Sequence, residues 1–251
     1  MFFWRPACPC DPPAKAWIEH RLGWLKSEFP DSAFSGRPVV LPTPEFFPDP
    51  YDRSHRSVRA MLDRICGYMG AEAELVSLEI TSSGHPPELV NERGEYLAGA
   101  AGTFSAGHGR VFITIDRMEL DEPMALVGTI AHELAHLRLL AEGRLRGHVF
   151  DHELLTDLAV VFFGLGIFLA NTPRNWASDM KTWPGTQLNR PEYMSPAMFG
   201  YALAHLGWHR GERRPRWARY LDPAPRAELR ASLRYLWRTG DSAFPPSSRR
   251  S

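Results

Sequence analysis

The sequence has little cysteine, no excess of charge and no apolar run long enough to cross a membrane. Three cysteines, Cys8, Cys10 and Cys66, cannot form a disulfide framework, which favours a reducing compartment. The longest apolar run, residues 158–170, is shorter than the roughly 20 residues of a spanning helix. The start lacks the basic segment and long apolar core of a secretory signal. We therefore expect a cytoplasmic protein.

Lysine is also scarce, so that almost all of the positive charge lies on arginine. The 29 basic residues balance the 29 acidic ones, and the chain as a whole is steered toward neither a polyanion nor a membrane. The last 46 residues nevertheless hold 11 arginines against four acids, with tryptophans between them. A nucleic-acid surface is one interpretation, but the sequence favours a solvated helical face. We expect neither nucleic acid nor a membrane as a partner.

Apolar periodicity predicts helices at both ends of the chain. Residues 14–29 and 54–70 each place apolar side chains at helical spacing, and a proline-rich, extended connector at 37–52 joins them. Further helices are expected within 195–212 and 225–240, and the tail 245–251 is expected to be disordered. No internal repeat is visible.

The middle of the chain changes its pattern. Residues 73–83 alternate as in a strand, and 94–116 suggest a hairpin whose second arm is "RVFITID". A long helix is then expected over 124–143, with Gly143 marking its end, and another over 151–171. Helices, then strands, then helices predict an α+β protein.

The helix at 124–143 carries the sequence His132-Glu133-x-x-His136. Residues four apart share one helix face, so the two imidazoles can hold a single Zn²⁺. Glu133 points about 100° away from His132, where its carboxylate can reach a water without occupying the metal. Two ordinary histidines on an amphipathic helix are the alternative, and a third ligand is needed to decide.

Five residues are candidates for that third ligand. Metalloproteases of the HExxHxxGxxH type are excluded, because positions 139 and 142 hold leucine and glutamate. Glu142 also points away from the two histidines if the helix is unbroken. The strongest candidate is Glu153, since "ELLTD" places it four residues before Asp157 on a strongly apolar helix. The candidates are Glu142, His148, Asp151, His152 and Glu153.

Asp157 is expected to support a metal ligand. An aspartate among leucine, alanine and valine is costly to bury without a partner. The N–H of a metal-bound imidazole would satisfy it and fix the tautomer of that ring. The alternative is a surface position on the polar side of the helix.

"HELAH" followed by "ELLTD" resembles the gluzincins, the thermolysin-like zinc metallopeptidases. The resemblance covers residues 110–171. It implies that His132, His136 and Glu153 bind zinc and that Asp157 supports a histidine. It also implies a zincin-like fold, with a small and mostly antiparallel sheet beside the active-site helix. The strand before that helix would then hold an extended peptide by β-addition.

The activity implied by this resemblance is hydrolysis of a peptide bond in a peptide or protein substrate. Glu133 would act as general base, with a further group stabilising the oxyanion. Tyr201 and His205, four residues apart, are the candidates for that group, and a buried packing pair is the alternative. The expected segments are an N-terminal part (1–72), a catalytic core (73–172), a C-terminal helical part (173–244) and the tail.

Two other functions remain open at this stage. The chain could be a non-enzymatic interaction protein, with a structural zinc or a relic of a peptidase core. It could also be a zinc amidase acting on a non-peptide amide. A second metal site formed by the three cysteines lacks a fourth ligand at suitable spacing, so free thiols are expected. The sequence does not indicate an oligomeric state.

Overall fold

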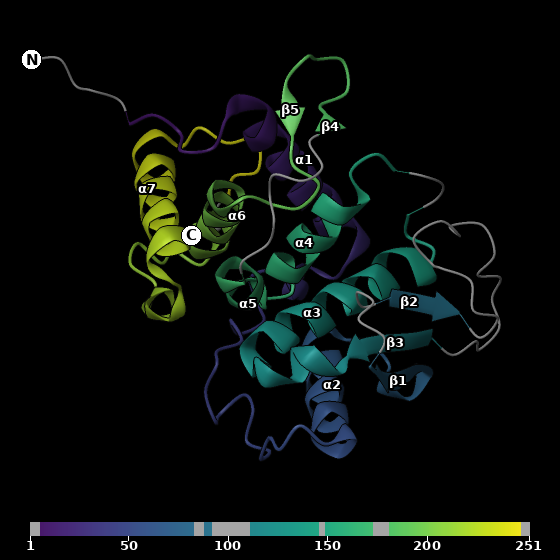
Figure 1. The fold of residues 1–251 in the computed structure, drawn as a ribbon. Helices are drawn as coiled ribbons and strands as arrows, with labels where there is room; N and C mark the ends of the chain where they lie inside the picture. Colours follow the sequence, from purple (N-terminus) through teal and green to yellow (C-terminus); the bar gives the residue numbers. More distant parts are fainter. Residues whose placement is uncertain (1–5, 83–87, 92–110, 146–148, 173–180, 247–251) are drawn as a thin grey trace, which may run out of the picture. The chain divides into compact units, whose positions relative to one another are not determined.

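Helices predominate in the structure, a computed structural model that describes residues 6–82, 88–91, 111–145, 149–172 and 181–246 (Figure 1). Strands are few and short in these ranges. The expectation of an α+β, zincin-like fold with a mostly antiparallel sheet is therefore wrong. The apolar residues that form the interior lie mainly on helices, and the sheet is too small to organise them.

The chain forms two compact units. Unit 1 comprises residues 1–39 and 153–251, and unit 2 comprises the continuous stretch 40–152. The N-terminal helix thus shares a unit with the C-terminal helices, although the sequence suggested separate segments at 1–72 and 173–244.

Unit 2 begins with a connector and a helix that the sequence predicted. Residues 37–52 contain no α-helix or strand, and α2 (His55–Met69) follows. The Ser54 hydroxyl accepts a hydrogen bond from the Ser57 N–H at 3.2 Å, and Gly70 ends the helix in the left-handed region. The predicted apolar stripe of α2 is buried throughout: Val58, Met61, Leu62, Ile65 and Met69.

The sheet of unit 2 has three strands in the order β1-β3-β2. The predicted strands at 73–83 and 110–116 correspond to β1 (Val76–Thr81) and β3 (Val111–Asp116). These two pair in parallel over six residues, whereas β2 (Glu88–Asn91) pairs with β3 in antiparallel fashion over four. The antiparallel expectation came from the resemblance to the gluzincins, and the alternation of residues within a strand could not correct it, because alternation does not indicate strand direction. The first arm of the predicted hairpin lies outside the described residues.

The long helix predicted over 124–143 is present in two parts. Helix α3 (Pro123–His136) starts with proline at its first turn, where the missing N–H costs nothing. A π-helical turn, η5 (Leu137–Ala141), follows directly, and the chain leaves it at Gly143 with φ of 68°. Helix α3 packs against α2 and contacts β2 (Figure 1).

In unit 1 the single helix predicted over 151–171 is interrupted. It consists of α4 (His152–Phe162) and α5 (Gly166–Asn171). Gly164 between them has φ of 88°, and a Cβ at this position would lie 2.7 Å from the Pro38 carbonyl oxygen. The left-handed backbone and the close contact both require glycine, and the helix is interrupted at this position.

The remaining helices of unit 1 are α1 (Pro12–Glu28), α6 (Pro196–His209) and α7 (Pro223–Thr239). Helix α6 packs closely on α7, and it also contacts α1 and α5. A two-stranded hairpin, β4 (Lys181–Thr182) and β5 (Asn189–Arg190), precedes α6. The apolar periodicity of the sequence predicts these three helices but not the hairpin.

Short 3-10 turns connect several of these elements. No described helix combines the length and apolar character that a membrane span needs. The 3-10 turns are η1 (Asp31–Ala33), η2 (Ala73–Leu75), η4 (Arg117–Asp121) and η6 (Arg216–Tyr220).

Candidate metal centre

His132 and His136 lie in the last turns of α3 with their rings facing each other. Both side chains are buried, with 5% and 7% of their surface exposed. Their Nε2 atoms are 3.2 Å apart, and the ring planes are almost perpendicular at 86°. The four-residue spacing on the helix therefore places one nitrogen of each ring close to one nitrogen of the other.

This separation fits two ligands of one zinc ion. Nitrogens bound at about 2.0–2.1 Å to a tetrahedral Zn²⁺ lie about 3.3–3.4 Å apart. An N–H···N hydrogen bond between the rings would have a similar length, with one ring donating to the other. The distance alone does not distinguish these two arrangements, so the identity of the third group matters.

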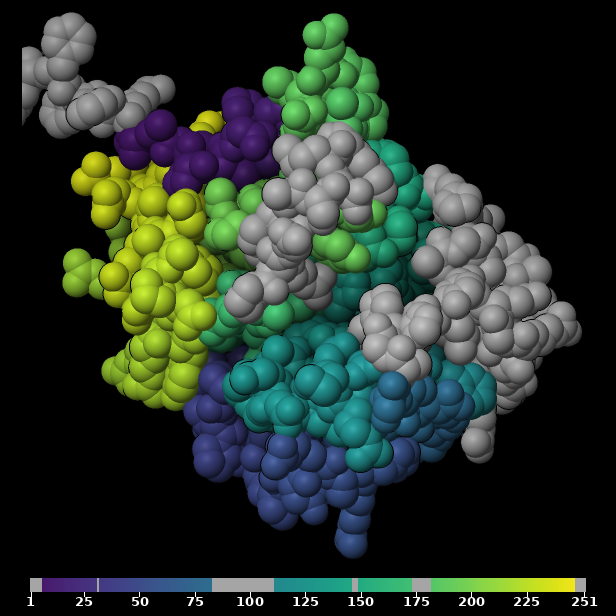
Figure 2. All heavy atoms as spheres, viewed as in Figure 1, coloured from purple at the N-terminus to yellow at the C-terminus, as the bar shows by residue number. Residues whose placement is uncertain are grey.

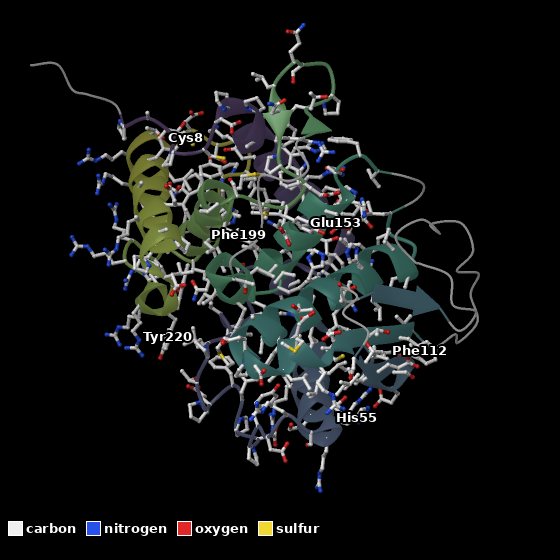
Figure 3. The ribbon with its side chains drawn as sticks, viewed as in Figure 1. Cys8, His55, Phe112, Glu153, Phe199 and Tyr220 are labelled. Carbon is white, nitrogen blue, oxygen red and sulfur yellow. The ribbon has the colours of Figure 1, made fainter. Side chains whose placement is uncertain are left out.

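The third group is Glu153. It is the second residue of α4, and it follows His152, whose ring centroid lies 5.9 Å from that of His136. One atom each from His132, His136 and Glu153 lie within 4.8 Å of one another. Figure 3 labels Glu153 on α4. Two imidazole nitrogens and a carboxylate oxygen are a ligand set that suits Zn²⁺.

The other candidates for the third ligand are placed differently. Glu142 forms ion pairs with Arg138 at 2.9 Å and with Arg144 at 2.8 Å. His148 lies outside the described residues. Asp151 is buried, yet within the described part of the chain it belongs to no group of side chains that could hold a metal. His152 lies beside His136 but is likewise not part of the three-ligand group.

Glu133 is buried next to the first histidine, with 8% of its surface exposed. It does not belong to the group of three ligand atoms. A buried carboxylate that does not itself bind the metal suits proton exchange with a water molecule.

Asp157 is fully buried, which excludes the surface position considered for it. One of its carboxylate oxygens accepts a hydrogen bond from the backbone N–H of Met194 at 2.9 Å. This aspartate therefore fixes the segment that leads into α6. Its predicted support of a histidine ligand stays a prediction.

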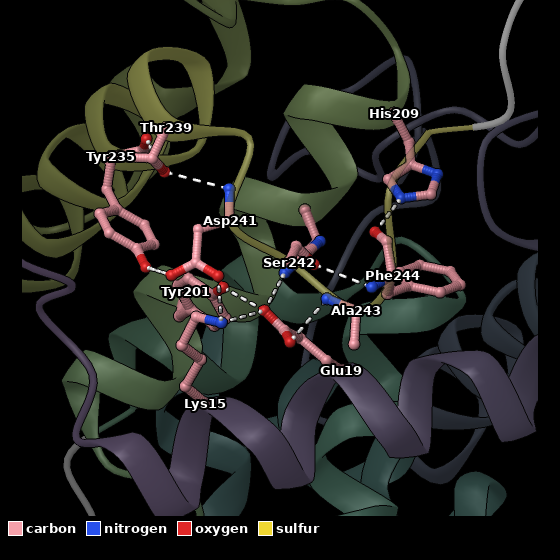
Figure 4. A network of polar contacts seen from close by, with 11 residues as sticks. Lys15, Glu19, Tyr201, His209, Tyr235, Thr239, Asp241, Ser242, Ala243 and Phe244 are labelled. Carbon is pink, nitrogen blue, oxygen red and sulfur yellow. Dashed lines mark hydrogen bonds and ion pairs between the residues drawn. The ribbon is translucent and has the colours of Figure 1, made fainter.

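Tyr201 lies in a buried polar cluster centred on Glu19 (Figure 4), and His205 lies near the same carboxylate. The Tyr201 hydroxyl donates to Glu19 Oε1 at 2.5 Å, Lys15 Nζ lies 3.0 Å from the same oxygen, and the Ala243 N–H donates to Oε2 at 2.9 Å. His205 Nε2 is 3.9 Å from Glu19 Oε1. Both candidate side chains have 0% exposure. These contacts give no support to the oxyanion role predicted for them.

Burial perturbs both groups of this pair. It raises the pKa of the Tyr201 phenol, and the hydrogen bond to Glu19 adds to the effect. It lowers the pKa of His205 to about 3, with His209 and then Lys15 as smaller causes. At neutral pH the tyrosine is therefore protonated and the histidine uncharged.

The amino-acid sequence gives little indication of this cluster. Glu19 and Lys15 are four residues apart on α1, a spacing common on solvated helices. Their partners are far along the chain: Tyr201 is 182 residues from Glu19, and Ala243 is 224 residues from it. Only the polar character of Glu19, on the buried side of the first helix, offered a signal.

The cysteines are free thiols, as expected. Burial raises the pKa of Cys8 and of Cys10, and it raises that of Cys66 to about 12. Thiolate is the form that binds metals, and burial disfavours it here. Within the described residues, no group suited to a metal includes a cysteine.

The chain matches no family model, no curated protein and no solved structure. Its similarity to the gluzincins thus stays a resemblance between short motifs, and the centre has to be judged by its own geometry.

Proposed function

We propose that this chain is a zinc-dependent hydrolase that cleaves a peptide bond. The observation that carries the proposal is the meeting of His132, His136 and Glu153, with Glu133, the residue after His132 on α3, buried but outside the ligand group. Catalytic zinc sites typically have three protein ligands and an open position, whereas structural sites have four. Three ligands among the described residues, together with the buried Glu133 carboxylate, favour the catalytic type.

Each residue has a distinct role in this proposal. The two imidazoles and the Glu153 carboxylate hold the cation. When bound, Zn²⁺ would supply a Lewis acid that polarises the scissile carbonyl and acidifies a water. Glu133 takes a proton from the attacking water and delivers it to the leaving amine. The buried setting excludes bulk water and strengthens the electrostatic interactions of these groups.

The peptide cannot bind as the resemblance implied. The strand before α3 was expected to receive it by β-addition, but β3 is the central strand of its sheet. Its two edges are already paired, one with β1 and the other with β2. A substrate would have to contact another part of the molecule, because no backbone edge of β3 is left to accept a strand.

The test compares the wild type with Glu133→Gln. Each purified protein is stripped of metal and reloaded with Zn²⁺, and bound zinc is measured by elemental mass spectrometry. Hydrolysis is followed with a mixture of fluorogenic peptides. We expect about one zinc per chain in both proteins. We expect hydrolysis to fall about 10²–10⁴-fold in Glu133→Gln, since only the general base is lost.

The same experiment separates the alternatives. Zinc binding with hydrolysis of simple amides but not of peptides would favour an amidase. Zinc binding with no hydrolysis of either would favour a structural role. A wild type that takes up no zinc would refute the proposal.

A further inference from the structure

Unit 1 contains a cavity of about 750 Å³ that has no part in the proposed metal centre. The cavity lies on α7, η6 and the loop before η6. Eight of its lining residues are arginines, and no acidic residue lines it. The apolar part of the lining includes Leu229, Leu233 and Trp237. Figure 2 shows the yellow segment that holds α7 at the molecular surface. The arginines are Arg213, Arg214, Arg216, Arg219, Arg226, Arg230, Arg234 and Arg238.

The positive charges of these arginines lack close acidic partners among the described residues. Within the described part of the chain, none of them forms an ion pair with a carboxylate. Seven are exposed, and Arg226 is half-buried. Eight like charges around one hollow repel each other and destabilise the folded chain, unless an anion binds there. Such an arrangement differs from an ordinary solvated face, where both signs alternate.

Four of the eight form a regular row. Arg226, Arg230, Arg234 and Arg238 follow each other at intervals of four along α7, so all four fall on one ridge of the helix. Successive members rise about 6 Å, and the row extends for about 18 Å. A single phosphate cannot span this length, whereas a chain of phosphates can.

The other four arginines line the same cavity from the segment before α7. Arg213 and Arg214 precede η6, and Arg216 and Arg219 lie within it. The guanidinium of Arg213 lies 4.3 Å from the centroid of the Trp237 ring, an arrangement that fixes both side chains. Both segments thus contribute positive charge to the lining, which also includes the aromatic ring of Trp237.

We propose that this arginine-lined cavity binds the phosphodiester backbone of single-stranded nucleic acid. Guanidinium groups pair with phosphates through two parallel hydrogen bonds, and a single strand can follow a row of them inside a hollow. A duplex is too wide to enter a cavity of this size. The contacts run to phosphates, so binding is independent of base sequence.

A membrane surface fits the cavity less well. Proteins that lie on lipid bury exposed apolar side chains between the headgroups. The large exposed apolar residues of the described chain lie elsewhere, and within the cavity Leu229 and Leu233 are buried. The basic surface therefore has the charge that anionic lipid attracts but not the apolar contacts that hold a protein in it.

The test measures binding of a fluorescent oligouridylate of about 15 nucleotides by anisotropy, between about 50 and 200 mM salt. The full chain is compared with Arg230→Gln/Arg234→Gln. A matched control, Arg56→Gln/Arg117→Gln, removes the same charge from exposed positions of unit 2. We expect the cavity variant to bind roughly tenfold more weakly. The slope of log K against log salt concentration should become less steep by about 1.4, because two phosphate contacts are lost. The control should bind as the wild type does.

Further arms identify the ligand and separate this site from the metal centre. An oligothymidylate should bind comparably, and a duplex of equal length more weakly. Chelating the metal should change nothing, because the proposal does not rest on zinc. Equal binding by the two double variants would overturn the proposal. So would tighter binding of the duplex, or binding of phosphatidylserine–phosphatidylcholine vesicles in place of the oligonucleotide.

Discussion

Two pairs of aromatic side chains in this protein have almost the same geometry and different chemistry. His132 and His136 on α3 have ring centroids 4.8 Å apart with planes at 86°. Tyr201 and His205 on α6 have centroids 4.9 Å apart with planes at 88°. In both cases the members are four residues apart on a strongly apolar helix, and both pairs are buried.

The glutamate near each pair accounts for the difference. Glu19 accepts a hydrogen bond from the Tyr201 hydroxyl and has Lys15 as its counter-charge, so its carboxylate already has its partners within the protein. Glu153 brings a carboxylate to two imidazole nitrogens, and these ligand atoms suit a cation. Ring geometry alone therefore says little about function. The hydrogen-bond donors, acceptors and charges around each pair of rings are more informative.

The strongest test of this contrast is loss of the metal. His132→Ala or Glu153→Ala removes one of three ligands, and we expect zinc affinity to fall by more than about 100-fold. Titration with a competing chelator measures this. His205→Ala, which removes the matching histidine of the other pair, should bind zinc like the wild type. Zinc loss in His205→Ala would show that the two clusters are not chemically distinct.

The next largest effect is expected from Glu19→Ala. This change removes the acceptor of the Tyr201 hydroxyl and the Ala243 N–H and leaves Lys15 without its nearest carboxylate. Breaking a buried ion pair in this way costs about 3–5 kcal/mol of unfolding free energy. Urea unfolding measures the loss. Zinc bound per folded chain should stay unchanged, and a stability near that of the wild type would contradict the central role of Glu19.

The pH dependence of stability gives a third test. Burial holds the pKa of His205 near 3 in the folded protein, below the value of about 6.5 expected in the unfolded chain. Between these values the unfolded chain binds the extra proton. The stabilising contribution is therefore complete above about pH 6.5 and falls by up to about 1.4 kcal/mol for each unit of acidification.

Replacing His205 by leucine should remove this contribution. The unfolding free energy of His205→Leu is expected to decline less steeply between about pH 6 and pH 4 than that of the wild type. The slopes are compared, because packing changes shift both curves as a whole. Parallel curves would mean that His205 titrates in the folded protein as it does in the unfolded chain.

The smallest effect is expected from Tyr201→Phe. It removes one hydrogen bond and leaves Lys15 and the Ala243 N–H on Glu19, so the loss is about 1–2 kcal/mol. Thermal unfolding can detect this. The control is Tyr220→Phe. The Tyr220 hydroxyl accepts a hydrogen bond from exposed Arg219 and should contribute less than about 0.5 kcal/mol to the free energy of unfolding. Equal effects in the two variants would remove the distinction between buried and exposed hydroxyls.

The sequence was informative where local pattern determines structure. The apolar stripe of residues 54–70 predicted α2 and its buried face, and Gly70 marked its end. The spacing of His132 and His136 predicted a shared face, and "ELLTD" directed attention to Glu153. Each of these inferences needs only the period of a helix and the chemistry of a few side chains.

Long-range features were not accessible in the same way. The parallel pairing of β1 with β3 depends on how the intervening chain returns, which alternation does not encode. The break at Gly164 depends on the carbonyl of Pro38, which lies far away in the sequence. For the same reason the sequence suggests Tyr201 as an oxyanion-stabilising group at the metal centre, whereas its hydroxyl donates a hydrogen bond to Glu19.

The Glu19 cluster also sets an order of events during synthesis of the chain. Ala243 emerges from the ribosome 224 residues after Glu19, a delay of about 10–45 s at ordinary elongation rates. Residues 40–152 form one continuous unit and are complete well before that moment. The Glu19 carboxylate on α1 therefore lacks its Ala243 partner while an entire unit of the protein is synthesised and can fold.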